Sequence, residues 1–260
     1  MSSATGRPAP LAERAVGYWA ESSRPMTSLL FIAPLLVAYE LGVVALGPAA
    51  IRNGADVWLR ELLRCVGFGQ YFLLPVLTVG ILVSWHYATR KPWRLTSGIF
   101  SGMIAECVLL ALCLRLVLEA QGILFEVVAG PLGPVDGTPA IGSAASDVVR
   151  QAVGYLGAGV YEELLFRLML LPAAAWTLQR LGLPRRTSVI LAVLSTSLLF
   201  AAAHYVGVQG DALQLADLAF WFSFTFRFLA GLFFSMLFVY RGFGIAAGTH
   251  AGYDILVGLF

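Results

Sequence analysis

Two carboxylates and a guanidinium lie in an otherwise apolar part of the chain. Residues 160–170 read VYEELLFRLML, where Glu162, Glu163 and Arg167 stand among eight apolar residues. Three unpaired charges near the centre of a membrane-spanning helix would cost on the order of 8–10 kcal/mol, so we predict that all three face protein or water. Residues four apart share a helix face, and Glu163 should therefore pair with Arg167. Glu162, turned by about 100° from Glu163, must find a partner on another helix.

Two more polar pairs have the same spacing. The stretch LLFAAAHY places Phe200 four residues before His204, and GTHAGYD places His250 four residues before Asp254. Glu162, the two histidines and Asp254 could converge from three helices into one pocket. A carboxylate in an apolar site can act as a general base, and an imidazole can orient the same water or stabilise a developing oxyanion. This combination favours the activation of water.

The composition indicates that these residues lie in a membrane protein. Of the 260 residues, 59% are hydrophobic and 12% are charged, and the mean hydropathy is +0.81. Soluble domains carry about a quarter charged residues. A spanning helix needs about 20 mostly apolar residues, and we identify seven candidate stretches: 27–47, 70–88, 97–120, 147–178, 187–206, 217–240 and 243–259. We therefore predict an all-α, polytopic transmembrane helix bundle of about seven spans.

The remaining segments suggest how this bundle is organised. Residues 1–25 are expected to form a cytoplasmic segment, and residues 26–260 a single transmembrane domain whose motif-bearing core is 147–258. The stretch 51–66 is too polar to span, but its apolar residues share one helical face, so we predict an interfacial amphipathic helix. Residues 121–145, rich in Gly, Pro and Ala, are expected to form a loop. The aromatic cluster FWFSFTFRF (220–228) is expected to face lipid or form an interfacial belt, although Arg227 within it, like Glu40 in the first span, could help to shape a substrate cavity.

Basic residues alternate between the connecting segments and predict the orientation. Ten lie on one side of the predicted spans and three on the other, which by the positive-inside rule gives a cytoplasmic N-terminus and an odd number of spans. The ten are Arg7, Arg14, Arg24, Arg90, Lys91, Arg94, Arg180, Arg185, Arg186 and Arg241, and the three are Arg52, Arg60 and Arg64. These features suit the inner (plasma) membrane of a bacterium.

Several classes of function are disfavoured. No run of five or more basic residues exists, so we expect no nucleic-acid partner. The three cysteines lack CxxC spacing, which argues against a disulfide framework or a cysteine-based zinc site. We expect no cofactor and no metal. The oligomeric state cannot be predicted from these features.

The three motifs together resemble a known family. The pattern EExxxR, then FxxxH, then HxxxN or HxxxD on successive membrane helices is similar to that of the CAAX prenyl protease type II, or CPBP (Abi), family of intramembrane proteases. Here the motifs run from Glu162 to Arg167, from Phe200 to His204 and from His250 to Asp254. The resemblance covers about residues 150–258 and none of the first three predicted spans.

The resemblance implies a glutamate-dependent endopeptidase that acts on a membrane-embedded or membrane-proximal peptide or protein. Glu162 would be the general base, His204 its partner in holding the attacking water, and His250 with Asp254 the oxyanion-stabilising pair. Glu163, Arg167 and Phe200 would be supporting residues. The best-known members have Asn at the last motif position. Because an ionised Asp cannot donate a hydrogen bond, Asp254 would have to stay protonated or act by orienting His250.

Two alternatives remain at this point. Two histidines and two carboxylates could bind zinc and make a metalloprotease, although the sequence lacks HExxH. The polar pocket could also bind without cutting, as in a membrane immunity protein, a binding partner or a transporter. We see no internal repeat of the kind that transporters often show.

Overall fold

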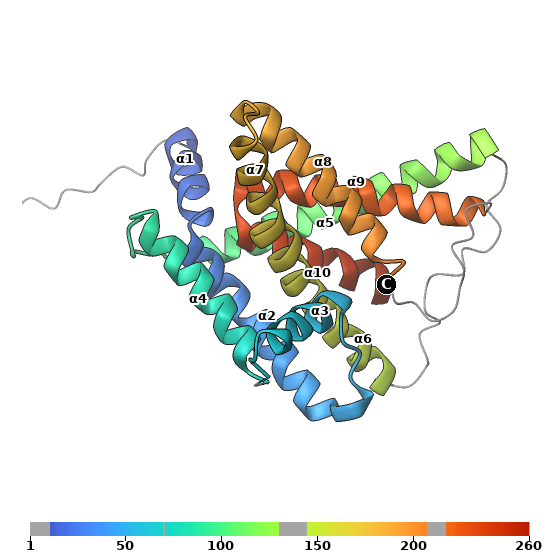
Figure 1. Cartoon of the computed structure of the whole chain (residues 1–260), viewed down its shortest axis with the longest axis horizontal. Helices are drawn as coiled ribbons and strands as arrows, with labels where there is room; N and C mark the ends of the chain where they lie inside the picture. Colours follow the sequence, from blue (N-terminus) through green and yellow to red (C-terminus); the bar gives the residue numbers. More distant parts are fainter. Residues whose placement is uncertain (1–10, 70, 130–144, 207–216, 260) are drawn as a thin grey trace, which may run out of the picture.

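The structure, a computed structural model, describes residues 11–69, 71–129, 145–206 and 217–259. Every regular element within these ranges is a helix, which confirms the predicted all-α membrane bundle (Figure 1). In chain order the elements are α1 (Leu11–Ser22), α2 (Pro25–Leu46), the 3₁₀ turn η1 (Gly47–Ala49), α3 (Gly54–Cys65), α4 (Leu73–Ala88), α5 (Ile99–Ala129), α6 (Ala145–Gly157), the π-helical turns η2 (Ala158–Glu162) and η3 (Leu164–Leu170), α7 (Leu171–Arg180), α8 (Arg185–Ala203), α9 (Leu218–Arg241) and α10 (Phe243–Leu259).

Local signals set the ends of the helices that carry the site. Asn53 caps α3, because its side-chain oxygen accepts a hydrogen bond from the amide of Ala55. Asp217 caps α9 in the same way. Helix α9 ends at Gly242, whose φ of +86° suits glycine, and α10 begins at the next residue. The caps therefore fix where the chain enters α3 and α9 and where it turns into α10.

Within the described residues, four helices are long and apolar enough to cross a membrane by length and composition. They lie at Pro25–Ala49, Ile99–Val128, Arg185–Ala203 and Leu218–Arg241. The other three predicted spans are also helical over most of their length, but α4 and α10 are shorter, and the fourth stretch is divided by η2 and η3. The count of seven spans stays a prediction.

Two boundaries differ from those expected. Residues 121–129 were expected to begin a loop, but they continue α5 to Ala129. The sequence GILFEVVA (122–129) contains one glycine and no proline, and the first proline after it is Pro131. The rest of the predicted loop, 130–144, lies outside the described residues. The N-terminal segment contains a helix, α1, which contacts α2 and α5.

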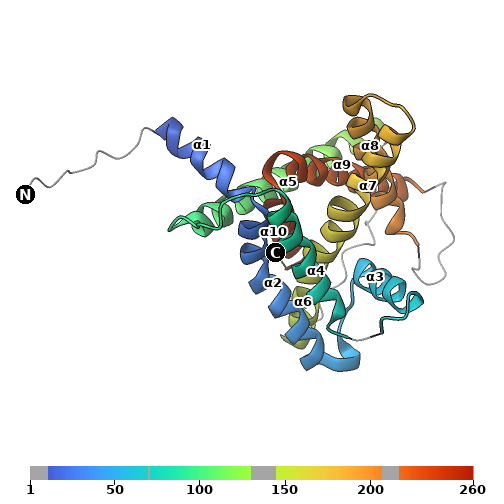
Figure 2. The ribbon, with the colours of Figure 1, turned by 60° about the vertical axis from the view of Figure 1, so that its left-hand side comes forward.

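Helix α10 occupies the middle of the bundle. It contacts α2, α5, α6, α9 and η2 (Figures 1 and 2), and Ala246 and Ala247 on it are fully buried. The amphipathic helix α3 lies against η2. It buries Ala55 and Leu59 but leaves Leu62 exposed, and Val66, directly after the helix, is exposed as well, so only part of the predicted apolar face packs on the protein.

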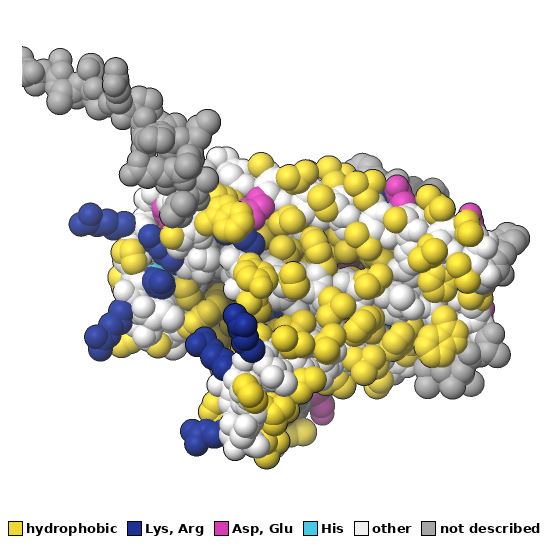
Figure 3. All heavy atoms as spheres, turned by 90° about the horizontal axis from the view of Figure 1, so that it is seen from above, with side chains coloured by type: hydrophobic (Ala, Val, Ile, Leu, Met, Phe, Trp, Pro, Cys, Tyr) yellow, Lys and Arg dark blue, Asp and Glu magenta, His cyan; other side chains and the backbone are white. Residues whose placement is uncertain are grey.

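The outer surface suits a bilayer. Large apolar side chains are exposed along the long helices, among them Leu41 on α2, Leu116 on α5 and Leu199 on α8. Figure 3 shows hydrophobic side chains over most of one face, with Lys and Arg side chains gathered toward one end. Charged groups that are buried inside such a molecule need protein partners.

Candidate active site

The two adjacent glutamates lie where the helix takes wide turns. Glu162 ends the π-helical turn η2 and Glu163 separates it from η3. Such turns are frequent at functional sites. Gly159 brings η2 against α10, because a Cβ at this position would lie 2.5 Å from the Cβ of Ala251. The residue before Ala251 is His250, so this close approach brings the first and third motifs together.

Glu163 contacts two of the other motif residues. Its Oε1 lies 3.0 Å from Nη1 of Arg167, so the predicted ion pair is present. The same oxygen lies 2.8 Å from Nδ1 of His250, a contact that we did not predict. Glu163 and Arg167 have no exposed side-chain surface. The guanidinium also donates to the carbonyl oxygen of Gly231 and lies 4.3 Å from the ring centroid of Phe200.

The two histidines point their Nε2 atoms at one oxygen of Glu162. The distances to Oε2 are 3.8 Å from His204 and 3.7 Å from His250. The Nε2 atom of His250 is also 3.6 Å from Oδ2 of Asp254. These separations exceed hydrogen-bond length, and one water could contact all three groups. The structure therefore brings together four of the predicted residues: Glu162, His204, His250 and Asp254.

Hydrogen bonds at Nδ1 orient both rings. The Nδ1 of His204 lies 2.8 Å from the carbonyl oxygen of Phe200. A carbonyl can only accept, so this nitrogen carries the proton, and in the neutral ring Nε2 is an acceptor. The ring of Phe200 packs edge-on against His204, and that of Phe234 stacks on His250 at 4.4 Å. The FxxxH spacing predicted a role for Phe200, whereas nothing in the sequence distinguished Phe234 from the other aromatic residues of its span.

Asn53 is a site residue that sequence reasoning missed. Its Nδ2 donates to Oε1 of Glu162 at 2.6 Å, while its Oδ1 caps α3. An Asn before an amphipathic stretch is a capping signal, but it does not reveal a contact 109 positions away. One oxygen of Glu162 is thus held, and within the described ranges the other, Oε2, has no hydrogen-bond partner.

The motif residues open onto a cavity of about 610 Å³. Its walls include Glu162, His204, His250 and Asp254, together with residues of α3, α6 and α9. The expectation that the aromatic cluster 220–228 faces lipid or a belt was wrong for Phe222 and Phe226, which line this cavity, as does Arg227. Glu40 is not among the lining residues and instead accepts hydrogen bonds from Tyr161 and Arg60. Aromatic walls with a few convergent polar groups are typical of ligand sites.

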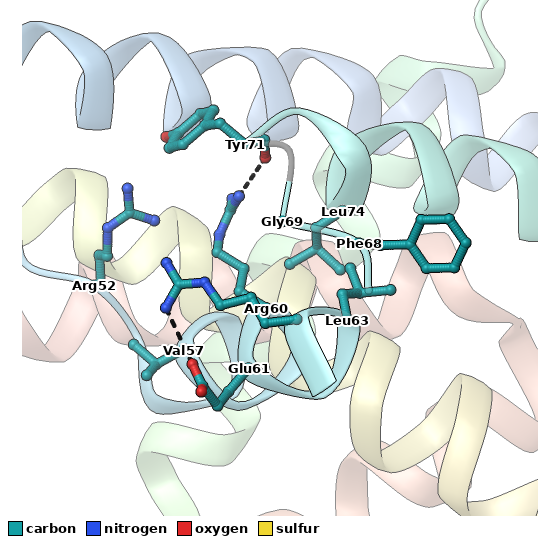
Figure 4. Close-up of a pocket in the computed structure, with 10 residues that line it drawn as sticks. Arg52, Val57, Arg60, Glu61, Leu63, Phe68, Gly69, Tyr71 and Leu74 are labelled. Atoms are coloured by element: carbon teal, nitrogen blue, oxygen red, sulfur yellow. Dashed lines mark hydrogen bonds and ion pairs between the residues drawn. The ribbon is translucent and has the colours of Figure 1, made fainter. Parts of the chain in front are cut away.

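A smaller pocket of about 340 Å³ lies between α3 and the start of α4 (Figure 4). Arg52, Arg60 and Arg64 line it, but each of these guanidinium groups has a carboxylate partner. Arg52 and Arg60 both pair with Asp56, and Arg64 pairs with Glu61. Arg60 also donates to the carbonyl oxygen of Tyr71, whose ring it covers. The positive charge of this pocket is thus balanced within the protein.

The donor geometry does not favour the zinc alternative. Among the helices and turns that the structure describes, no group of three or more His, Cys, Asp or Glu side chains is arranged to hold a metal ion.

Comparison with known families gave a match in the second half of the chain. Residues 144–256 match a family model described as type II CAAX prenyl endopeptidase Rce1-like. The matched range includes all the predicted site residues from Glu162 to Asp254, but it does not include Asn53. Comparisons with curated proteins and with solved structures gave no match.

Proposed function

Since residues 144–256 belong to the type II CAAX prenyl endopeptidase family, we propose that this membrane protease cuts a peptide bond with a water activated by Glu162. The family assignment gives a CAAX-type intramembrane protease in general terms. The glutamate and histidine mechanism that follows, and the assignment of roles to single residues, are our proposal.

Glu162 is proposed as the general base. A water placed between Glu162 Oε2 and the Nε2 atoms of the two histidines would give one proton to the carboxylate as its oxygen attacks the scissile carbonyl carbon. The neutral ring of His204 accepts the second hydrogen of this water and so aims its lone pair. Glu162 then passes its proton to the nitrogen of the leaving amine, and the carbon–nitrogen bond breaks.

His250 is proposed to stabilise the oxyanion. Glu163 holds its Nδ1 and the ring of Phe234 supports its face, so Nε2 has a fixed direction. As an imidazolium, His250 donates from both nitrogens, to Glu163 and to the developing oxyanion. Asp254, 3.6 Å from Nε2, is proposed to orient this ring, which does not require it to donate a hydrogen bond.

One observation carries the proposal. Glu162 is a nearly buried carboxylate on a cavity wall, and its Oε2 has no hydrogen-bond partner among the described residues while it faces two imidazoles. Oε2 of Glu163 also lacks a hydrogen-bond partner among the described residues, but only Glu162 of the two lines the cavity and directs its unpaired oxygen at two imidazoles.

The test is the variant Glu162→Gln, which keeps the shape and removes the base. Purified wild-type and variant proteins are reconstituted in liposomes with a mixture of quenched fluorescent peptides, and the products are identified by mass spectrometry. We expect the cleavage rate to fall about 100-fold to 10,000-fold. The control Glu61→Gln changes an exposed carboxylate and should cleave like wild type. Undiminished cleavage by folded Glu162→Gln protein would refute the mechanism.

A further inference from the structure

Arg227 places a positive charge in the same cavity as the proposed catalytic residues. It lies in α9, a helix that is long and apolar enough to cross a membrane. Its side chain lines the cavity together with Glu162 and His204. A guanidinium at this depth is costly, and such residues mark functional sites by default.

The partners of Arg227 are neutral and occupy only part of its donor set. Nη1 donates to the hydroxyl of Tyr205 at 2.8 Å and to Oγ of Ser223 at 2.6 Å. The guanidinium also lies 5.1 Å from the ring centroid of Tyr205. Arginine has five N–H donors, so Nε and Nη2 keep three that have no protein acceptor among the described residues.

Arg227 has no carboxylate partner among the described residues, unlike Arg52, the other arginine that lines the cavity, which pairs with Asp56. Arg167 pairs with Glu163, Arg241 with Glu106, and Arg60 with Asp56. The positive charge of Arg227 faces the cavity instead. Arginine matches the planar geometry of a carboxylate and can bind it through two parallel hydrogen bonds.

We propose that Arg227 binds a carboxylate of the peptide substrate. This inference rests on the proposed peptidase function, because it places the carboxylate in the cavity that Glu162 lines. The carboxylate can be a free C-terminus or an acidic side chain, since both offer the same two oxygens to the guanidinium.

The groups around Arg227 determine how a bound substrate would be oriented in the cavity. Tyr205, which holds Nη1, directly follows His204 in the chain, so the charge is tied to the helix end that carries a proposed water ligand. Glu162 and Asp254, which also line the cavity, would repel a substrate carboxylate. The bound carboxylate is thereby directed to Arg227, and the neutral peptide segment next to it is left for Glu162. The rings of Phe222 and Phe226, also in the cavity wall, provide apolar surface for that segment.

A binding measurement separates this inference from the proposed chemistry. It uses full-length protein that carries Glu162→Gln, so that peptides bind without being cut. Three fluorescent hexapeptides of Ala and Leu serve as probes: one with a free C-terminal carboxylate, its C-terminal amide, and the amide with one residue replaced by Glu. We expect at least one of the two carboxylate peptides to bind about tenfold or more tightly than the neutral amide. Which of them does so identifies the source of the carboxylate.

Variants of Arg227 test whether it causes this preference. Arg227→Gln should abolish the preference, and Arg227→Lys should retain part of it, because the charge remains while the planar fork is lost. Arg227→Lys also serves if Arg227→Gln does not fold. The control Arg115→Gln removes an arginine that pairs with Glu119 and does not line the cavity, and it should keep the full preference.

Two results would overturn the inference. One is equal affinity for all three peptides, including no binding of any. The other is a carboxylate preference that persists unchanged in folded Arg227→Gln protein. Neither result bears on whether Glu162 is needed for cleavage, which the variant of that residue tests in active protein.

Discussion

Glu162 and Glu163 are adjacent in the sequence but have different surroundings. One oxygen of Glu163 contacts both Arg167 and His250, so this carboxylate compensates a buried charge and also orients a ring. Removing one partner of a buried ion pair typically costs about 3–5 kcal/mol. Glu162 has one oxygen held by Asn53 and the other directed at the two histidines. We therefore assign Glu163 to positioning and Glu162 to the chemistry.

Asn53 should affect activity through its hold on Glu162. Asn53→Ser keeps a side-chain oxygen that can cap α3 but is too short to reach Glu162. A hydrogen bond to a charged group contributes about 1.5–3 kcal/mol, so we expect kcat to fall about tenfold to hundredfold. The measurements are steady-state cleavage and the thermal unfolding midpoint of the protein in detergent.

The matched variant for Asn53→Ser is Asn53→Ala, which also loses the cap. It should show a similar loss of kcat and, in addition, a loss of about 0.5–2 kcal/mol in the free energy of unfolding. A wild-type kcat in Asn53→Ser would mean that the hydrogen bond does not position Glu162.

Contacts between site residues on the same helix were predictable from the sequence. Contacts between residues on different helices were not. The spacing of four residues gave the pairs Glu163–Arg167 and Phe200–His204, since helix geometry is local. The contact of Glu163 with His250 joins η2 and α10, and the contact of Asn53 with Glu162 joins α3 and η2. No property of the separate segments specifies which of them are neighbours.

At the scale of elements, the site depends on the close packing of η2 against α10. The sequence indicated a single helix over 147–178. Glycines in this stretch allow close approach to other helices at Gly157, where a Cβ would lie 2.3 Å from the ring of Tyr39, and at Gly159. The division into α6, η2, η3 and α7 was not predictable, because residues 164–175 (LLFRLMLLPAAA) are apolar on nearly every helix face and show no periodicity that a wide turn could shift.

Gly159→Ala should destabilise the protein and reduce its activity. The added methyl group would lie 2.5 Å from Cβ and 2.6 Å from the amide nitrogen of Ala251, so α10 must move away from η2 and carry His250 with it. Overpacking of this kind costs about 1–3 kcal/mol. Thermal unfolding in detergent and the cleavage rate are the two measurements.

Gly80→Ala is the control for Gly159→Ala. A Cβ at this position in α4 meets nothing within 4 Å, and alanine is the better helix former. Its unfolding midpoint should equal or exceed that of wild type. If both variants were as stable and as active as wild type, the contact between η2 and α10 would not be required by the site.

At the scale of the whole molecule, contacts unite basic segments that are far apart in the chain. Arg24 donates to the carbonyl oxygen of Arg94, and Arg241 donates to the carbonyl oxygen of Trp19 and to Ser22. The segments before α2, after α4 and after α9 therefore meet at one end, in line with the gathering of Lys and Arg in Figure 3. By the positive-inside rule we propose that this end is cytoplasmic.

The position of α3 then predicts the face from which the cavity is reached. Helix α2 begins at the basic end, so α3, which follows it, belongs to the opposite side of the membrane. Asn53 and Gly54 at the start of α3 line the cavity, so we expect the cavity to open on that side.

We expect a membrane-impermeant maleimide to label Cys65, an exposed residue of α3, in intact bacterial cells when Cys107 and Cys113 are replaced by Ser. The control is Thr89→Cys, beside the basic segment after α4, in protein whose three native cysteines are all replaced by Ser. This cysteine should be labelled only after the cells are lysed. The reverse pattern would place the basic end outside and the cavity mouth in the cytoplasm, because α3 carries the label and part of the cavity wall together.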